Sequence, residues 1–194
     1  KQNAGEQNAG RWLRRLADRM QYALHLIEST ELPVIAALHG QVLGMGLELA
    51  LACDLRVVAE DCLLSISEAS MRLVADVGGT TRLTKLVGPG RAKDLLMTCR
   101  AVDANEAREW GLANRVVPAA ELMPAALSLA EQIARHAPLA VGMAKRIVDL
   151  GDGVDRQTQM ALERWAQSQL IDSDDVREAA RAFIEKRPPQ FQGR

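Results

Sequence analysis

Residues 33–76 read PVIAALHGQVLGMGLELALACDLRVVAEDCLLSISEASMRLVAD, and this stretch decides the fold. It opens with an apolar run at residues 34–38 that is closed by His39-Gly40, which predicts a buried strand followed by a turn. Gly44-Met45-Gly46 then leads into good helix-forming sequence at residues 47–53. Because the first N–H groups of a helix have no acceptor within it, this glycine turn predicts a place where negative charge is stabilised.

Three carboxylates accompany the glycine turn. Glu48 falls in the first turn of the predicted helix, Glu68 follows a strand-like segment at residues 63–67, and Asp76 precedes Gly78-Gly79. Taken singly, Glu48 is typical of a partner for the helix dipole, and the other two are typical of solvated loop acids. Together they indicate a cluster of acids beside an anion-binding turn.

The segments before and after this stretch predict further helices and strands. An amphipathic helix is expected over residues 11–27, after a polar loop formed by the first ten residues. The chain begins at Lys1 rather than Met, so we expect a missing N-terminus. After the central stretch begins, strands are expected at residues 55–59 and, at a sheet edge, at residues 114–117. Between them we expect a helix that is capped by Thr80 or Thr81 and ends at Gly88, and a short helix at residues 91–98. A further helix is expected to be capped by Asp103, with Glu106 as the second member of a capping box.

After Pro118 the pattern becomes purely helical. Apolar residues recur at helical spacing over residues 121–136, 139–150, 154–170 and 175–186, and residues 172–174 provide caps for the last helix. The sequence therefore predicts two regions, 1–117 and 118–194.

Composition narrows the classes of function. The chain has 194 residues, is 48% hydrophobic and carries a formal net charge of −1, so it gives no electrostatic basis for binding nucleic acid or an anionic membrane. Its apolar runs are far shorter than the roughly 20 residues of a membrane-spanning helix. The three cysteines, Cys53, Cys62 and Cys99, share no metal-ligand spacing and indicate inert thiols in a reduced, cytoplasmic compartment.

From about residue 32 onward, the sequence resembles the crotonase, or enoyl-CoA hydratase/isomerase, superfamily. The resemblance is carried by residues 33–61, by residues 67–118 and by the ending REAARAFIEKRPPQF at 177–191. It implies an α/β fold in which a crotonase-like spiral of ββα units over 1–117 precedes a helical C-terminal trimerisation region over 118–194. The N-terminal part of the family fold is absent from this sequence.

The resemblance also implies site residues. The family binds acyl-CoA and stabilises a thioester enolate between two backbone N–H groups. One N–H group falls at Met45, where the family usually has glycine, and Glu48 and Glu68 fall on the two catalytic glutamates of the hydratases. Phe183 and Lys186 fall where the family meets the coenzyme A of a neighbouring subunit. The implied protein is a homotrimer or a dimer of trimers that uses no metal and no cofactor other than the coenzyme A of its substrate.

Two departures from the family pattern leave alternatives open. The second N–H donor of the family lies on an earlier segment that is absent here. Asp76, eight positions after Glu68, resembles the dienoyl-CoA isomerases, in which two carboxylates shuttle a proton, although those enzymes usually carry Asp at the Glu48 position. The candidate functions are therefore an enoyl-CoA hydratase/isomerase, a dienoyl-CoA isomerase, a catalytically silent acyl-CoA-binding member of the fold, and a plain helical interaction module.

Overall fold

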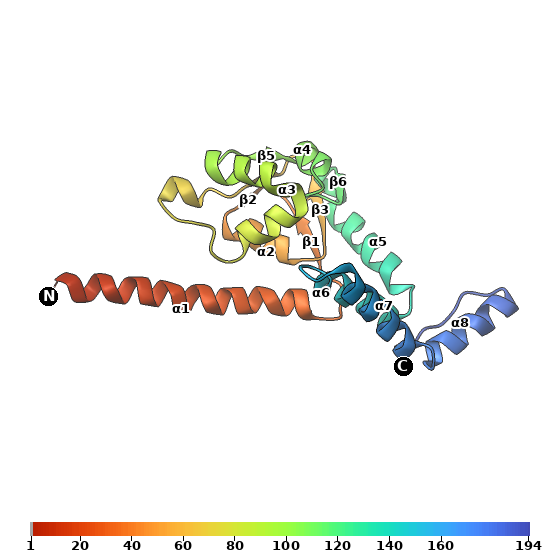
Figure 1. Cartoon of the computed structure of the whole chain (residues 1–194). Coiled ribbons are helices and arrows are strands. Elements are labelled where there is room, and N and C mark those ends of the chain that lie inside the picture. The colour runs from red at the N-terminus through yellow and green to blue at the C-terminus, as the bar shows by residue number, and fades with distance from the viewer. Residues whose placement is uncertain (1) are drawn as a thin grey trace. The chain divides into compact units, whose positions relative to one another are not determined.

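The computed structural model describes the backbone of residues 2–194 and the side chains of residues 8–194. Contacts within the chain group it into two units. The first holds the chain through Glu28 together with Val34–Ala126, and the second holds Ser29–Pro33 together with Leu127–Arg194. Figure 1 labels most of the helices and strands, and each unit is described by itself.

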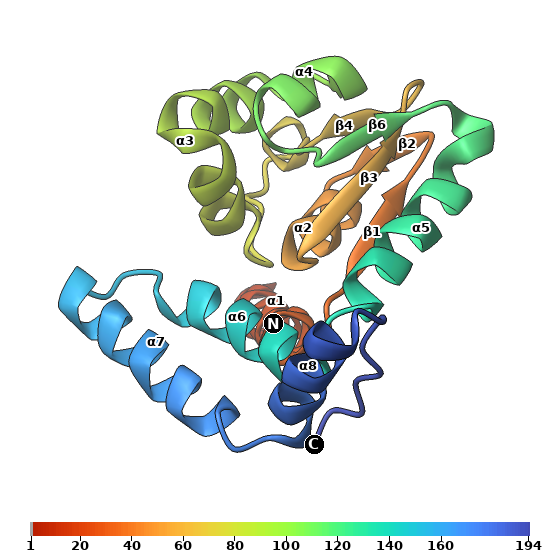
Figure 2. The same cartoon turned by 90° about the vertical axis from the view of Figure 1, so that its right-hand side faces the viewer.

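The strands of the first unit form two three-stranded sheets. One sheet consists of β1 (Ile35–Leu38), β3 (Leu55–Ala59) and β6 (Arg115–Val117), which run parallel and lie side by side in Figure 2. The other consists of β2 (Gln41–Leu43), β4 (Leu63–Ser65) and β5 (Val102–Asp103), in which β2 and β4 are parallel and β5 is antiparallel to β4. The predicted edge position of β6 is confirmed.

Successive segments give one strand to each sheet and then a helix. β1 and β2 are followed by α2 (Met45–Ala52), and β3 and β4 are followed by the 3₁₀ turn η1 (Glu68–Met71) and by α3 (Gly79–Thr98). The bend between β1 and β2 lies at Gly40, whose φ of 64° favours glycine. The predicted spiral of ββα units is thereby confirmed.

Aliphatic side chains fill the first unit. Leu47 of α2, Val57 of β3 and Leu95 of α3 are fully buried. A smaller cluster joins Leu24 of α1 (Gln2–Ser29) to Ala52 and Val77. This cluster packs α1 against the segment that leads into α3.

A buried arginine closes the C-terminal end of α2. Arg56, on β3, is 3% exposed, and its Nη1 donates to the carbonyls of Cys53 and Ala50 over 2.7 and 3.4 Å. Its Nε donates to the carbonyl of Leu112 over 2.7 Å. Burial lowers the pKa of Arg56. The bonds to Ala50 and Cys53 place a cation at the C-terminal end of the helix, where the last carbonyls are not all paired within it.

The second unit is helical. It contains most of α5 (Leu122–Ala134), which follows the 3₁₀ turn η2 (Ala119–Glu121), and then α6 (Pro138–Leu150), α7 (Arg156–Leu170) and α8 (Asp174–Glu185). The predicted cap of the last helix is confirmed, because Ser173 Oγ accepts the N–H of Val176 over 3.3 Å. None of the helices within residues 2–194 combines the length and apolarity needed to cross a membrane.

Two local predictions were wrong, and a third was confirmed. The expected N-terminal loop is helical from Gln2 onward, because its Gln, Ala and Glu residues have good helix propensity. Thr80 and Thr81 lie inside α3, whose N-cap is Gly78 without a side-chain hydrogen bond. The predicted end at Gly88 is confirmed as a break inside α3, where Gly88 has φ 78° and ψ 163°.

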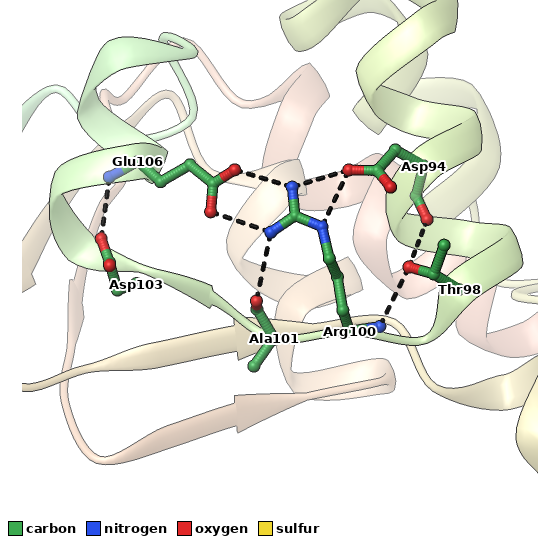
Figure 3. Close-up of polar contacts among 6 residues, drawn as sticks. All are labelled: Asp94, Thr98, Arg100, Ala101, Asp103 and Glu106. Atoms are coloured by element: carbon green, nitrogen blue, oxygen red, sulfur yellow. Dashed lines mark hydrogen bonds and ion pairs between the residues drawn. The ribbon is translucent and has the colours of Figure 1, made fainter.

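The expected capping box at Asp103 is half formed. The Asp103 carboxylate accepts the N–H of Glu106 over 2.9 Å and starts α4 (Ala104–Glu109). The Glu106 side chain instead binds Arg100, with Oε1 2.7 Å from Nη2 (Figure 3). The Arg100 guanidinium explains why the Glu106 side chain does not bind the Asp103 N–H group, since a charged partner forms a stronger hydrogen bond than a backbone amide.

Asp103→Ala should lower the free energy of unfolding by about 1 kcal/mol, because α4 loses the acceptor for its first turn. Thr81→Ala, at an exposed position inside α3, should change it by less than about 0.5 kcal/mol. Urea unfolding followed by circular dichroism measures both values. Equal losses in the two variants would contradict the assignment of Asp103 as the cap.

Candidate active site

The N-terminal end of α2 forms one wall of the candidate site. Gly44 is its N-cap, with φ 50° and ψ −120°, and the N–H groups of Leu47 and Glu48 donate back to the Gly44 carbonyl. Met45 and Gly46 come before these residues in the first turn, where a helix offers their N–H groups no acceptor. The Met45 side chain is half exposed. The predicted donor thus lies at the positive end of a helix.

Glu48 is buried and held by backbone amides. Its side chain is 2% exposed, and Oε1 accepts the N–H groups of Val77 and Gly79 over 3.0 and 2.8 Å. A Cβ atom on Gly79 would lie 2.7 Å from Oε1. Only a glycine at this position therefore lets the carboxylate approach the amide so closely.

Glu68 lies against the same glycine turn as Met45. A Cβ atom on Gly44 would be 2.6 Å from Glu68 Oε1, so this carboxylate touches the backbone that starts α2. Its Oε2 is shielded from solvent and has no hydrogen-bond partner among the described side chains and backbone groups. A buried carboxylate oxygen without a partner costs free energy, which marks a position suited to receive a polar ligand group or a proton.

The charges of Glu68 and Asp76 act on Glu48. Burial is the largest cause that raises the pKa of Glu48, and the two amide hydrogen bonds oppose it. The charges of Glu68 and Asp76 raise it further. Asp76 is exposed, in the loop between η1 and α3. The structure therefore brings Glu48, Glu68 and Asp76 into one electrostatic neighbourhood.

This arrangement provides two chemical capabilities. A buried carboxylic acid with a raised pKa keeps its proton to a higher pH than an exposed one, so it can both give up and take back a proton during a reaction. Unpaired N–H groups at the start of a helix can stabilise an oxygen that becomes negative during a reaction. The site thus combines proton transfer with stabilisation of an oxyanion.

Apolar side chains are exposed on the elements that carry the acids and on the neighbouring strand β2. They come from β2, from α2, from η1 and from the segment between η1 and α3, and they are Leu43, Met45, Leu49, Met71, Leu73 and Val74. An apolar surface of this kind fits a hydrocarbon ligand.

Phe183 and Lys186 belong to the second unit and the acids to the first. Phe183, on α8, is 86% exposed. Lys186 is the C-cap of α8 and adopts a left-handed conformation with φ 54°. Both side chains are thus accessible at the end of one helix.

The sequence did not reveal the groups that hold Glu48. No function was predicted for Gly78-Gly79 from the sequence, whereas the amides of Val77 and Gly79 bind the buried carboxylate. The usable signal was a glycine pair close to the acids, because glycine allows such close backbone approach.

The cysteines and acids do not indicate a metal centre. Within the side chains of residues 8–194, no group of three or more His, Cys, Asp or Glu residues is arranged to hold a metal ion. Burial raises the pKa of the Cys62 thiol to about 11, which fits an inert thiol.

The chain is similar to known proteins over most of its length. The profile of the family described as Enoyl-CoA hydratase/isomerase matches residues 5–194. The short-chain-enoyl-CoA hydratase of Clostridium acetobutylicum is 39% identical, over 83% of this chain and 62% of that protein. The enoyl-CoA hydratase domain-containing protein 2, mitochondrial, of Mus musculus is 40% identical, over 91% of this chain and 61% of that protein.

A solved structure of an enoyl-CoA hydratase has the same fold. A crystal structure of the enoyl-CoA hydratase from Bacillus anthracis superposes with a TM-score of 0.92 at 39% identity, covering 95% of this chain and 71% of that one. The chain spans 61% to 62% of the length of the two curated relatives.

Compared with the wild type, Glu48→Gln should become progressively more stable to unfolding as the pH rises above the ordinary glutamate pKa of 4.5. Below that pH the carboxyl group is protonated in both the folded and the unfolded state. Above it the unfolded state ionises first, because burial raises the pKa of Glu48 in the folded state, and the wild type loses stability until the folded group also ionises. Glutamine has no such loss.

Urea unfolding of both proteins between about pH 4 and pH 8 measures this difference. Glu60→Gln, which removes an exposed acid from the same unit, is the control. A difference between Glu48→Gln and wild type that is constant with pH would contradict the raised pKa.

Proposed function

Because the chain belongs to the enoyl-CoA hydratase/isomerase family, we propose that its protein hydrates or isomerises the double bond of an unsaturated fatty acyl-CoA. The observation that carries this proposal is the electrostatic coupling of Glu48, Glu68 and Asp76 beside the start of α2. The exposed apolar side chains on the same elements provide a surface for the acyl chain. Coenzyme A enters as part of the substrate, and the chemistry needs no further cofactor.

In the hydration reaction, water adds to C3 of the enoyl thioester and a proton is delivered to C2. Glu48 and Glu68 hold the water, one as base and the other as acid, and the two exchange the proton that restores the starting state. The charge on the thioester oxygen is stabilised by the Met45 N–H group at the positive end of α2. A second donor is expected from a part of the protein outside this chain.

Asp76 supports dienoyl-CoA isomerisation as the second candidate. Its charge acts on Glu48, and its exposed side chain lies in the loop that follows Glu68. In this alternative Glu68 and Asp76 remove and return a proton at separate carbons of a conjugated chain, and Glu48 orients the substrate. A catalytically silent acyl-CoA-binding protein is the remaining outcome.

We propose coenzyme A contacts for Phe183 and Lys186, in a homotrimer or a dimer of trimers. The exposure of Phe183 and Ile184, at 86% and 79%, supports an intermolecular contact on α8. The cytoplasm is the proposed compartment, on the basis of the cysteine pattern.

Glu48→Gln and Glu68→Gln should each lower kcat for a 2-enoyl-CoA by about 10²–10⁴-fold, since each removes one participant in proton transfer. The assay follows the absorbance of the conjugated thioester with the intact protein, and Glu60→Gln is the matched control. Turnover that survives both substitutions would refute these roles. Tight coenzyme A binding without turnover would indicate the silent alternative.

Asp76→Ala separates the two reactions in the same assay. It should abolish turnover of a 3,5-dienoyl-CoA and spare hydration if Asp76 is part of the isomerase pair. Loss of hydration with retention of isomerisation would reject that role.

Light scattering of the intact protein should give three or six times the mass of one subunit. A trimer is expected because the apolar residues exposed on α8 need a covering surface. A mass of one subunit at micromolar concentration would contradict the proposed assembly.

A further inference from the structure

A second network surrounds the segment that holds Glu48. Arg82, near the start of α3, donates from Nε and Nη2 to the two carboxylate oxygens of Glu28 on α1, over 2.6 and 2.8 Å. Its Nη1 donates to the carbonyl of Val77 over 2.9 Å. Since the Arg82 side chain is 14% exposed, this bidentate ion pair is better shielded from water than an ordinary surface pair.

The peptide that Arg82 holds lies between the two peptides that bind Glu48. The Val77 carbonyl belongs to the peptide that joins Val77 and Gly78. The N–H groups that donate to Glu48 belong to the peptides immediately before and after it. Fixing the central peptide therefore restricts the rotation of both donors.

Gly78 makes this approach feasible. Its φ of 100° favours glycine, and a Cβ atom there would collide with the Arg82 guanidinium. The pair Gly78-Gly79 thus has two separate functions, because Gly78 admits the arginine and Gly79 admits the Glu48 carboxylate.

Helix α1 holds the same segment at a second point. Gln21 Nε2 donates to the carbonyl of Asp76. This carbonyl and the Val77 N–H group belong to the same peptide, the one that joins Asp76 and Val77. Glu28 and Gln21 therefore connect α1 to two consecutive peptides of the segment 76–79.

We propose that Arg82, anchored by Glu28, is a positioning residue that orients the Val77 and Gly79 amides towards the Glu48 carboxylate. The inference deepens the proposed function and rests on it, because the consequence for turnover depends on proton transfer by Glu48. Arg82 acts through the backbone and is not assigned a contact with substrate.

The groups around Glu48 determine the direction in which its pKa changes when Arg82 is lost. Hydrogen bonds from the two amides favour the ionised carboxylate, whereas burial and the charges of Glu68, on η1, and Asp76, in the following loop, oppose it. Arg82 of α3 and Glu28 of α1 are the charged groups that hold the peptide between the two amides. Loss of the arginine should therefore let the amides move and make Glu48 ionise at a higher pH.

The test compares Arg82→Lys and Glu28→Gln with Arg100→Lys in the intact protein. Arg100 is a matched control, since it forms ion pairs with Asp94 and Glu106 over 2.6 and 2.7 Å within the same unit (Figure 3). The first measurement is a carbon-13 NMR titration of the Glu48 carboxyl group, identified by its loss in Glu48→Gln. The second is the pH dependence of kcat/KM.

Arg82→Lys should move both the Glu48 titration and the acidic limb of kcat/KM upward by about one pH unit, which is about a tenfold loss of activity below the limb. Glu28→Gln should give a smaller shift in the same direction. Arg100→Lys should lower thermal stability and leave both pH profiles in place.

Two results would overturn the proposal. One is a Glu48 titration that is the same in wild type, Arg82→Lys and Glu28→Gln. The other is an equal shift in Arg100→Lys, which would indicate a general loss of stability. If Arg82→Lys fails to fold, Glu28→Gln decides alone. A shifted titration in a protein that turns over no acyl-CoA would support the positioning contact and reject the proposed function.

Discussion

The burial of the Glu48 carboxylate is the constraint on which the site depends. A carboxylate removed from water needs hydrogen-bond donors, and here the amides of Val77 and Gly79 provide them. Two glycines let Glu48 and Arg82 approach this backbone, and Arg82 connects it to Glu28 of α1. Segments far apart in the sequence thus converge around one buried acid.

The longer elements of the fold were predictable from the sequence because their patterns are local. β3 spans the predicted residues, and the end of a helix at Gly88 appears as a break in α3. β2 and β5 were missed since they have three and two residues, too few for a period to emerge. Their pairing with β4 depends on tertiary contacts, to which a single sequence gives no access.

The candidate acids could be named from the sequence, but their geometry could not. The acids Glu48, Glu68 and Asp76 follow from the glycine turn and the family resemblance, and the structure places Glu68 and Asp76 within electrostatic reach of Glu48. Arg82 was indistinguishable from any helix-surface arginine in the sequence. Its relation to Glu28 spans 54 positions, and only the folded chain brings the two side chains together.

The two ends of α2 differ in their electrostatic balance. At the C-terminal end, the fixed cation of Arg56 neutralises the partial negative charge of the last carbonyls. At the other end the helix begins at Met45, and the N–H groups of its first turn have no acceptor within the helix. Because these polar groups are already aligned by the fold, little reorganisation energy is required when an oxygen beside them gains charge. The fold therefore gives the two ends of one short helix different roles, a neutralised end inside the unit and an electropositive end beside the acids.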